Sequence, residues 1–444
     1  MLEEAVVEYH NLLAEEPDKY ARDLEKIYHK LEAENIYYHG EVIPILYQPL
    51  FFSQSEIDQI SRLTAKLSSI LTKVINRYLV DEEFRSYFGF SQELEDLILA
   101  NPGYSSPVPM ARFDIFYYGE EDYKFCELNT DGSSGMVKTN VLEKKFLQAE
   151  GIKGLTEKTD YNFAYCELLD EWLDILLANY QEFNPEDDSP NIAIMDFDNL
   201  GMVSEFEYFR VLLQNSGYRT VIVDPRELKY ENNKLYYGGL EIDLIYRRAV
   251  TIDIMEYYSE IEDLLAAYYN QDVCIVGSFR SQIIHNKIIF AILHDEDKTG
   301  FLDKEDRRFI EEYIPETALI TKERQQLNYI KDNREELVLK PLDFYGAQGV
   351  YIGCDLTPSQ WEDALNNIQP EQYLVQKFCS IPELEMAVLE EDELRLESFK
   401  YTLGLFMYNL SFAGIYTRAG KDNLIASSTG CVTLPNFVVG ENRI

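Results

Sequence analysis

The most informative segment of this 444-residue chain is MARFDIFYYGEEDYKFCELNTDGSSGM, residues 110–136. Two runs with alternating apolar and polar character flank the polar stretch GEED, a pattern that predicts two antiparallel strands joined by a short turn. Side chains two residues apart in a strand point to the same face, so Arg112 and Asp114 should share one side of the first strand. Phe113 and Ile115 should then face the core.

The second predicted strand separates its polar and apolar side chains in the same way. Glu127, Asn129 and, by extension, Asp131 fall on one face, while Leu128 falls on the other. The hairpin would then gather an arginine, three carboxylates and an amide on one surface. Mg²⁺ prefers oxygen ligands from one or two carboxylates with substrate phosphates and water, so this surface predicts a magnesium site. A solvated polar face with cross-strand ion pairs is the alternative that periodicity leaves open.

A phosphate-binding loop is predicted in VLKPLDFYGAQGVYIG, residues 338–353. An apolar strand is expected to end at Lys340, and Pro341 prevents further hydrogen bonding along the ladder. Gly346 and Gly349 allow a close, flexible loop whose backbone N–H groups would face phosphate oxygens. The Walker pattern GxxxxGK followed by Ser or Thr is absent from this segment, and an ordinary hairpin is the alternative.

The remaining sequence predicts an α+β, or mixed α/β, chain in four parts. Residues 1–105 have mainly helical periodicity, and residues 106–185 contain the hairpin followed by further helix. Residues 186–280 begin with a strand, a helix and a second strand, which indicates a small Rossmann-like layer, but they lack GxGxxG and so imply no dinucleotide cofactor. Residues 281–444 contain several predicted strands, two of which flank the glycine-containing loop.

Composition excludes several classes of partner. The chain has 79 acidic and 40 basic residues and a formal charge of -39, which repels nucleic acids and anionic lipids. Such charge would suit a cationic substrate, although acidic surfaces usually serve solubility. The six cysteines form no CxxC pair and the five histidines no HExxH motif. The acidic start, MLEEAVVEYH, and the absence of an apolar run of roughly 18 to 20 residues predict a cytoplasmic protein without membrane contact.

Several blocks in a fixed order connect these features to a known family. RFD followed by ELNTDGSSGM resembles the metal-binding motifs of glutathionylspermidine synthase and its circularly permuted ATP-grasp relatives. The blocks IDLIYRR, HNKIIFAIL, LVLKPLDFYGAQGVYIG, QYLVQKF and FAGIYTRAG resemble later parts of that family, so the similarity extends over roughly residues 20 to 435. It implies an ATP-grasp fold with permuted motif order, a Rossmann-like pre-ATP-grasp subdomain and an N-terminal helical layer.

The resemblance also implies roles for the polar residues of the hairpin. Asp114, Glu127 and Asn129 match the positions that hold Mg²⁺ in the family. Arg112 matches a residue beside the transferring phosphoryl group, and Arg418, in IYTRAG, matches an arginine near the reacting groups. For Arg418, an exposed strand arginine is the alternative.

The nucleotide contacts are implied in the same way. Lys287 and Lys340 resemble the lysines that reach the ATP phosphates, and Gly346 and Gly349 belong to the loop that covers them. Gln376, in YLVQKF, matches the strand that lines the adenine.

The resemblance implies an ATP- and Mg²⁺-dependent ligase that joins a small-molecule or peptide carboxylate to an amine through an acyl phosphate. Spermidine-dependent members present adjacent glutamates where this chain has SEFE, residues 204–207, so the resemblance does not identify the amine. Two alternatives stay open. One is a non-catalytic regulatory or assembly protein with the ATP-grasp fold, and the other is an ATP-grasp kinase.

Overall fold

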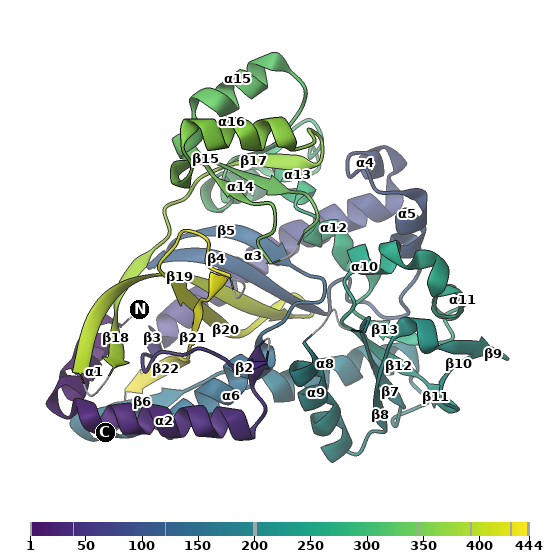
Figure 1. Ribbon diagram of the computed structural model, residues 1–444. Helices are drawn as coiled ribbons and strands as arrows, with labels where there is room; N and C mark the ends of the chain where they lie inside the picture. Colours follow the sequence, from purple (N-terminus) through teal and green to yellow (C-terminus); the bar gives the residue numbers. More distant parts are fainter. Residues whose placement is uncertain are drawn as a thin grey trace.

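The computed structural model shows a mixed α/β protein in which three sheets position the residues predicted above (Figure 1). A large sheet lies at the centre, a small antiparallel sheet stands above it, and a parallel sheet lies to one side. The structure describes residues 2–38, 40–119, 121–198, 202–344, 346–390, 393–426 and 429–441.

The central sheet confirms the predicted hairpin. Its two strands, β4 and β5, pair antiparallel at one edge of the sheet. On its other side, β4 pairs with a strand from the C-terminal part of the chain. The strand order is β21-β20-β19-β4-β5, with β18 paired to β19. The strands are β4 (Met110–Gly119), β5 (Asp122–Asn129), β18 (Glu383–Glu390), β19 (Glu393–Tyr408), β20 (Ser411–Gly420) and β21 (Val432–Leu434).

The register places the predicted polar pairs directly across the hairpin. Arg112 lies opposite Asn129, and Asp114 lies opposite Glu127. A β-bulge follows Asp114, where the register shifts before Ile115. The alternation of polar and apolar residues therefore gives the hairpin one polar face in the folded protein, as the sequence predicts.

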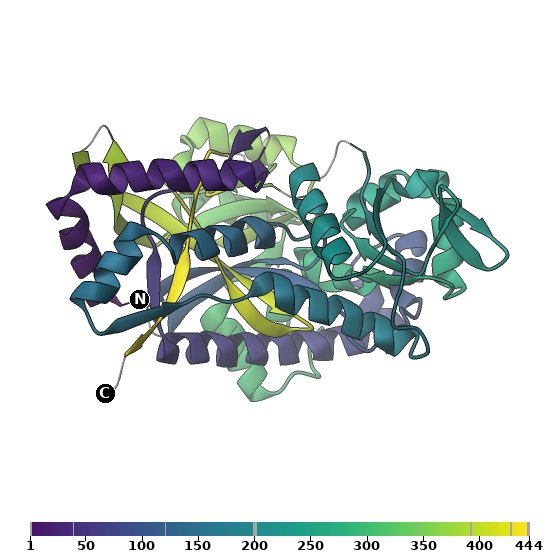
Figure 2. The same ribbon diagram turned by 90° about the horizontal axis from the view of Figure 1, so that it is seen from below.

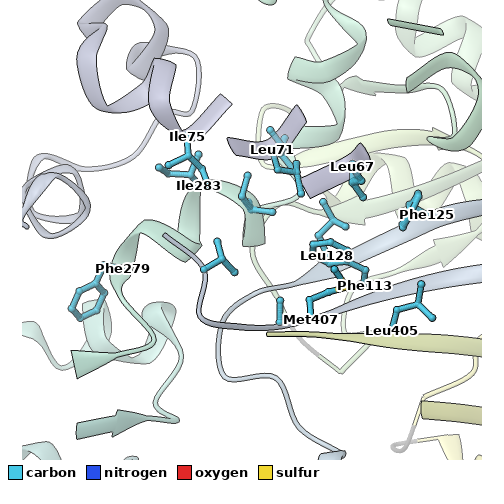
Figure 3. Packing of buried hydrophobic residues seen from close by; sticks show 14 of the residues in the cluster. Leu67, Leu71, Ile75, Phe113, Phe125, Leu128, Phe279, Ile283, Leu405 and Met407 are labelled. Carbon is cyan, nitrogen blue, oxygen red and sulfur yellow. The ribbon is translucent and has the colours of Figure 1, made fainter. Parts of the chain in front are cut away.

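The opposite face of the sheet forms the main hydrophobic core. Phe113 and Leu128 are buried there, next to Leu67 and Leu71 of helix α3 (Gln54–Val80) (Figure 3). Helix α3 is amphipathic, and its apolar stripe covers the sheet because burial of that stripe stabilises both elements. The packing fixes the sheet from behind and leaves its polar face available.

Helices of the N-terminal part enclose the central sheet. Helix α3 begins with a capping box in which Ser53 and Glu56 satisfy each other's backbone N–H groups. Helices α2 and α3 run along opposite sides of the molecule, with strands of the large sheet between them (Figure 2). The other helices of this part are α1 (Glu3–Glu15), α2 (Pro17–Ala33), α4 (Glu82–Ser86) and α5 (Gln92–Leu99).

The parallel sheet contains the strand–helix–strand unit expected after the hairpin. Strands β7 and β8 are parallel, and α9 connects them. The strand order is β13-β12-β7-β8, and every pair is parallel. The elements are β7 (Ile192–Met195), α9 (Val203–Asn215), β8 (Thr220–Val223), β12 (Leu244–Arg247) and β13 (Cys274–Val276), with a separate sheet formed by β9 (Lys229–Glu231), β10 (Lys234–Tyr237) and β11 (Leu240–Ile242).

The small antiparallel sheet carries the predicted phosphate loop. Its order is β14-β17-β15-β16, and the loop connects β15 to β16. Helices α15 and α16 lie above the sheet in Figure 1. The elements are β14 (Thr317–Leu319), α15 (Arg324–Asp332), β15 (Leu337–Pro341), β16 (Tyr351–Ile352), α16 (Pro358–Asn367) and β17 (Tyr373–Lys377).

Helices α12 to α14 connect the parallel sheet to the small sheet, whereas α10 and α11 connect β12 to β13 within the parallel sheet. Lys287 lies in the short gap between α12 and α13. None of the helices in the described ranges is both long and apolar enough to cross a bilayer. The helices are α10 (Thr251–Glu256), α11 (Glu262–Tyr269), α12 (Gln282–His285), α13 (Ile288–His294) and α14 (Lys304–Tyr313).

Short strands interrupt two regions whose periodicity predicts helix. β3 (Leu50–Ser53) and β6 (Tyr161–Ala164) both pair with β22 (Asn436–Glu441), near the opposite end of the chain. Local periodicity cannot reveal strands this short, because partners distant in sequence create them. The second helical region therefore divides into α6 (Met136–Phe146), α7 (Glu150–Lys158) and α8 (Leu168–Phe183), while β1 (Tyr37–Tyr38) and β2 (Glu41–Val42) form a separate hairpin.

Candidate active site

A cavity of about 1250 Å³ lies where the polar face of the central sheet meets the small sheet and the parallel sheet. Nearly all the residues predicted for the site line it. Gly349 does not line the cavity. Its backbone is left-handed, and a Cβ at this position would meet Tyr373 and Pro341, so the glycine lets the loop pack closely against these two residues. The predicted residues that line the cavity are Arg112, Asp114, Glu127, Asn129, Lys287, Lys340, Gly346, Gln376 and Arg418.

Asp114 organises the polar face of the hairpin. Arg112 donates from Nε to one carboxylate oxygen at 2.7 Å, and Arg418 donates to the other at 2.7 Å. Arg112 also donates to the carbonyl of Ser134 at 2.7 Å. Burial lowers the pKa of Arg418, but Asp114, Tyr416, Cys431 and Glu127 together outweigh it and raise that pKa above its usual range. These contacts hold two permanently charged guanidinium groups in fixed positions beside the cavity.

Glu127 is more open to the cavity than Asp114 across the hairpin, with its side chain 32% exposed against 3%. Lys287 Nζ lies 3.0 Å from one of its oxygens, and the Asn129 amide lies 3.3 Å from the other. Burial raises the pKa of Glu127, but Lys287 and Lys340 outweigh it and hold that pKa well below its usual range. Glu127 therefore carries a negative charge throughout the physiological pH range.

The oxygen groups on this face suit Mg²⁺. Asn129 contacts Asp114 at 3.1 Å as well as Glu127, so its amide joins the two carboxylates that face each other across the hairpin. Two carboxylates and one amide oxygen leave positions for phosphate oxygens and water, which is the usual arrangement around this ion. Asp114, Glu127 and Asn129 would hold the metal.

Lys340 connects the small sheet to the hairpin. Its ammonium donates to the Cys126 carbonyl of β5 at 3.0 Å and to Gln376 Oε1 at 2.7 Å. Gln376 in turn donates to Thr317 at 2.8 Å. Burial lowers the pKa of Lys340, whereas Glu127 opposes this shift. Gln376 thus positions Lys340, a contact that strand periodicity alone does not predict.

Lys287 connects Glu127 to the loop between β15 and β16. Its ammonium donates to the Phe344 carbonyl at 2.9 Å, and its backbone N–H donates to the Leu342 carbonyl at 2.9 Å. Gly346 is left-handed and has open space where a Cβ would stand. The loop therefore begins at a point held by the same lysine that contacts the hairpin carboxylate.

Replacing Lys340 with Met is expected to weaken ATP binding about tenfold or more, because it removes a positive charge beside the proposed phosphate position while keeping most of the stem volume. Titration of folded protein with Mg²⁺-ATP, followed by calorimetry, measures this change. Lys331→Met is the matched control, since Lys331 pairs with Glu362 on the surface of the same unit. Equal affinity in Lys340→Met and wild type would remove Lys340 from the nucleotide site.

Asp131 corrects one expectation about the hairpin face. Strand β5 ends at Asn129, so Asp131 leaves the strand and does not join the other carboxylates. It pairs instead with Arg247 at 2.6 Å, and both side chains are only 1% exposed. Burial raises the pKa of Asp131, but Arg247 and His285 outweigh it and lower that pKa. This buried pair fixes the loop after β5 to the parallel sheet.

Arg248 holds the same loop at a second point. It donates to the Ser133 carbonyl and pairs with Glu205 at 3.0 Å. Glu205 also accepts from the Gly135 backbone N–H at 3.0 Å. Glu205 is thus fully engaged, whereas Glu207 pairs with Arg210 on the surface. Neither glutamate of SEFE presents a free carboxylate to the cavity.

The far end of the cavity, toward the parallel sheet, carries two further carboxylates. Asp196 follows β7, and Asp253 lies on α10. Burial raises the pKa of Asp196 to about 6; Arg248 opposes this shift, and Asp253 adds to it. Burial likewise raises the pKa of Asp253 to about 6. The Rossmann-like layer places these groups where the carboxyl end of a parallel strand meets a cavity, a common ligand position in α/β sheets.

Gly404 is a site residue that the sequence pattern does not reveal. It lies in β19, between Asp114 of β4 and Tyr416 of β20. A Cβ at this position would lie 2.6 Å from Arg112 Cδ and 2.9 Å from Asp114 Oδ1. The only available signal is a glycine inside a long strand, which often marks a close approach.

Comparisons with known proteins agree with this architecture. Residues 14–433 match the family described as glutathionylspermidine synthase preATP-grasp. A putative glutamate–cysteine ligase 2-2 from Frankia casuarinae is 23% identical over 204 residues, which cover 43% of this chain and 22% of that protein. The chain thus spans about a fifth of the length of that relative.

The solved structure of a glutathione synthetase-like effector from Globodera pallida, in its apo form, has a similar fold. The TM-score is 0.62 at 10% identity, over 94% of this chain and 96% of that chain. This likeness extends over the whole architecture, and the family match covers nearly all of the sequence. The chain has an ATP-grasp fold and belongs to the glutathionylspermidine synthase preATP-grasp family.

Proposed function

We propose that the protein is an ATP- and Mg²⁺-dependent ligase that joins a carboxylate to an amine through an acyl phosphate. The observation that carries this proposal is the meeting of two lysines, Lys287 and Lys340, with Asp114 and Glu127 at one point of the cavity. Cations that reach phosphate oxygens and carboxylates that hold a metal are the two requirements of phosphoryl transfer.

The division of the chain supports this use of the cavity. The metal-binding part is proposed for residues 106–185 and the nucleotide-binding part for 281–444, with the phosphate groups between them. The pre-ATP-grasp layer, residues 186–280, would supply the end of the cavity where the amine binds. The negative charges of Asp196 and Asp253 there would attract an ammonium group.

The chemistry proceeds in two displacements. A carboxylate oxygen of the acid substrate attacks the γ-phosphorus of ATP, the bond to the ADP oxygen breaks, and an acyl phosphate forms. The amine nitrogen then attacks the carbonyl carbon, the bond from that carbon to the phosphate oxygen breaks, and inorganic phosphate leaves. The amine loses one proton as the amide forms.

The residues of the chain act mainly by placement and charge. Arg112 and Arg418, held by Asp114, would stabilise negative charge on the phosphoryl and acyl oxygens. Lys287 and Lys340 would hold the ATP phosphates, and the loop at Gly346 would exclude water from the acyl phosphate. Mg²⁺, when bound, would neutralise charge on the phosphate oxygens.

ADP release with candidate acids and amines, added separately and together, tests the proposed function. A ligase releases ADP, inorganic phosphate and amide in equal amounts and requires both substrates for amide formation. A kinase would release ADP with a phosphorylated product and no inorganic phosphate. A regulatory protein would bind ATP without releasing ADP under any combination, and either of these outcomes would overturn the proposal.

A further inference from the structure

His285 is a side chain of the cavity wall that the proposed chemistry does not use. The residue is 8% exposed, and its Nδ1 atom is buried without a hydrogen-bond partner in the described part of the chain. Its Nε2 atom has no hydrogen bond to a described residue either. Because Nδ1 is buried, Nε2 is the ring nitrogen that can meet a molecule in the cavity. A nearly buried polar side chain without a partner is uncommon, and a ligand would satisfy it.

The short helix α12 fixes the orientation of this imidazole. Ile283 lies on the opposite side of the helix from His285, because successive residues of an α-helix are about 100° apart. Ile283 packs in the main hydrophobic core beside Ile75 of α3 (Figure 3). Gln282 donates to the Asp343 carboxylate at 2.5 Å, which ties the same helix to the loop after β15. These contacts anchor α12 on the side of the core and leave His285 at the cavity.

His285 lies between the proposed phosphate and amine ends of the cavity. Lys287, two residues further along the chain, belongs to the phosphate end. Burial raises the pKa of Asp131, but Arg247 and His285 outweigh it and lower that pKa, so the imidazole is within electrostatic reach of this carboxylate. Asp131 accepts the backbone N–H at the start of α10 at 2.5 Å, and α10 carries Asp253 at the amine end. The amine and the acyl phosphate would therefore meet beside His285.

The second displacement of the proposed reaction needs a proton acceptor, and the carboxylates of the cavity already have other roles. Asp114 and Glu127 would hold the metal and contact arginine or lysine side chains. Asp131 is paired with an arginine. Asp196 and Asp253 would bind the ammonium form of the amine. An imidazole changes its charge near neutral pH, so it can accept a proton and release it again in each turnover.

We propose that His285 is the general base of amide formation and accepts the proton that the amine loses. This inference rests on the proposed function, because it assigns a residue to the second displacement. As the amine nitrogen forms its bond to the carbonyl carbon, one N–H bond breaks and the proton moves to His285 Nε2. The phosphate leaves with the electron pair of the C–O bond. Asp131 stabilises the imidazolium, which then releases its proton to water.

Rescue of His285→Ala by imidazole tests this role. The assay uses the acid and the amine that give amide in the ADP-release experiment above. The variant should form amide about a hundredfold or more slowly than the wild type, because general base catalysis contributes about 10² to 10⁴-fold. Added imidazole should raise the rate of the variant about tenfold or more, since it can occupy the space that the side chain leaves. His285→Gln, which fills that space, should lose the same rate without rescue.

Trapping of the acyl phosphate separates the two displacements. The protein is incubated with ATP and the acid but no amine, and hydroxylamine in the quench converts acyl phosphate to a hydroxamate. Folded His285→Ala and the wild type should give equal amounts, because His285 has no part in the first displacement. His29→Ala is the control, since the His29 side chain is 80% exposed on α2. It should form amide at the wild-type rate with or without imidazole.

Three results would overturn the role of His285 as the base. They are wild-type amide formation by both His285 variants, a loss of hydroxamate together with amide, and an unchanged rate of His285→Ala in imidazole. The first result would move the proton to Asp253 or to water. Amide formation without hydroxamate in the wild type would instead overturn the acyl phosphate route of the ligase.

Discussion

Glu127→Gln is expected to reduce ADP formation by about two to four orders of magnitude while the protein stays folded. Gln keeps the shape of the side chain and most of its hydrogen bonding but removes the charge that a metal ligand provides. Charge neutralisation in phosphoryl transfer supplies several kcal/mol, and each 1.36 kcal/mol is about tenfold in rate. ADP formation is measured across a Mg²⁺ titration, because high metal concentration can partly refill a weakened site.

Asp122→Asn is the control for this variant, since it removes a carboxylate from the exposed start of the same strand. We expect it to change stability by about 0.5 kcal/mol or less and to leave ADP formation intact. Wild-type turnover by folded Glu127→Gln at ordinary Mg²⁺ would place Glu127 outside the active site. The main support for the ligase assignment would then be lost.

Gly404→Ala is expected to abolish most activity, because the added methyl group would displace the side chains of Arg112 and Asp114. The new methyl group would overlap Arg112 and Asp114, whose side chains are held by each other and by Arg418, so they cannot move without losing these contacts. Overpacking of this kind destabilises a protein by about 1 to 3 kcal/mol. A displacement of about 1 Å in an active site lowers the rate about a hundredfold, and ADP formation should fall by at least that factor.

The matched control is Gly420→Ala, in the next strand of the same sheet. A Cβ there would meet Ile425 at 3.9 Å, which is an ordinary contact. Thermal unfolding and ADP formation are measured on both variants. Full activity in Gly404→Ala would show that Arg112 and Asp114 need not occupy the observed positions for catalysis.

The local pattern of the sequence predicts the hairpin well, and the physical reason is simple. Alternation places Arg112, Asp114, Glu127 and Asn129 on one face because side chains in a strand point to opposite sides in turn. The strand–helix–strand unit around α9 is equally predictable, since both periodicities are strong there. Both elements are formed by segments that follow one another in the sequence, so a single sequence is enough to predict them.

Contacts between distant segments could not be predicted from residue patterns. Arg418 reaches Asp114 across 304 positions, and only the family resemblance indicated that the two belong together. The prediction that Asp131 shares the polar face of the hairpin is wrong, because periodicity does not show where a strand ends.

Transfer of oxygen from the acid substrate to phosphate tests the central claim most directly. The acid is labelled with ¹⁸O in its carboxylate, and the inorganic phosphate released with the amide is analysed by mass spectrometry. An acyl phosphate passes one carboxylate oxygen to phosphate, so we predict one ¹⁸O atom in the phosphate for each amide formed. Amide formation with unlabelled phosphate would contradict activation of the carboxylate by phosphoryl transfer.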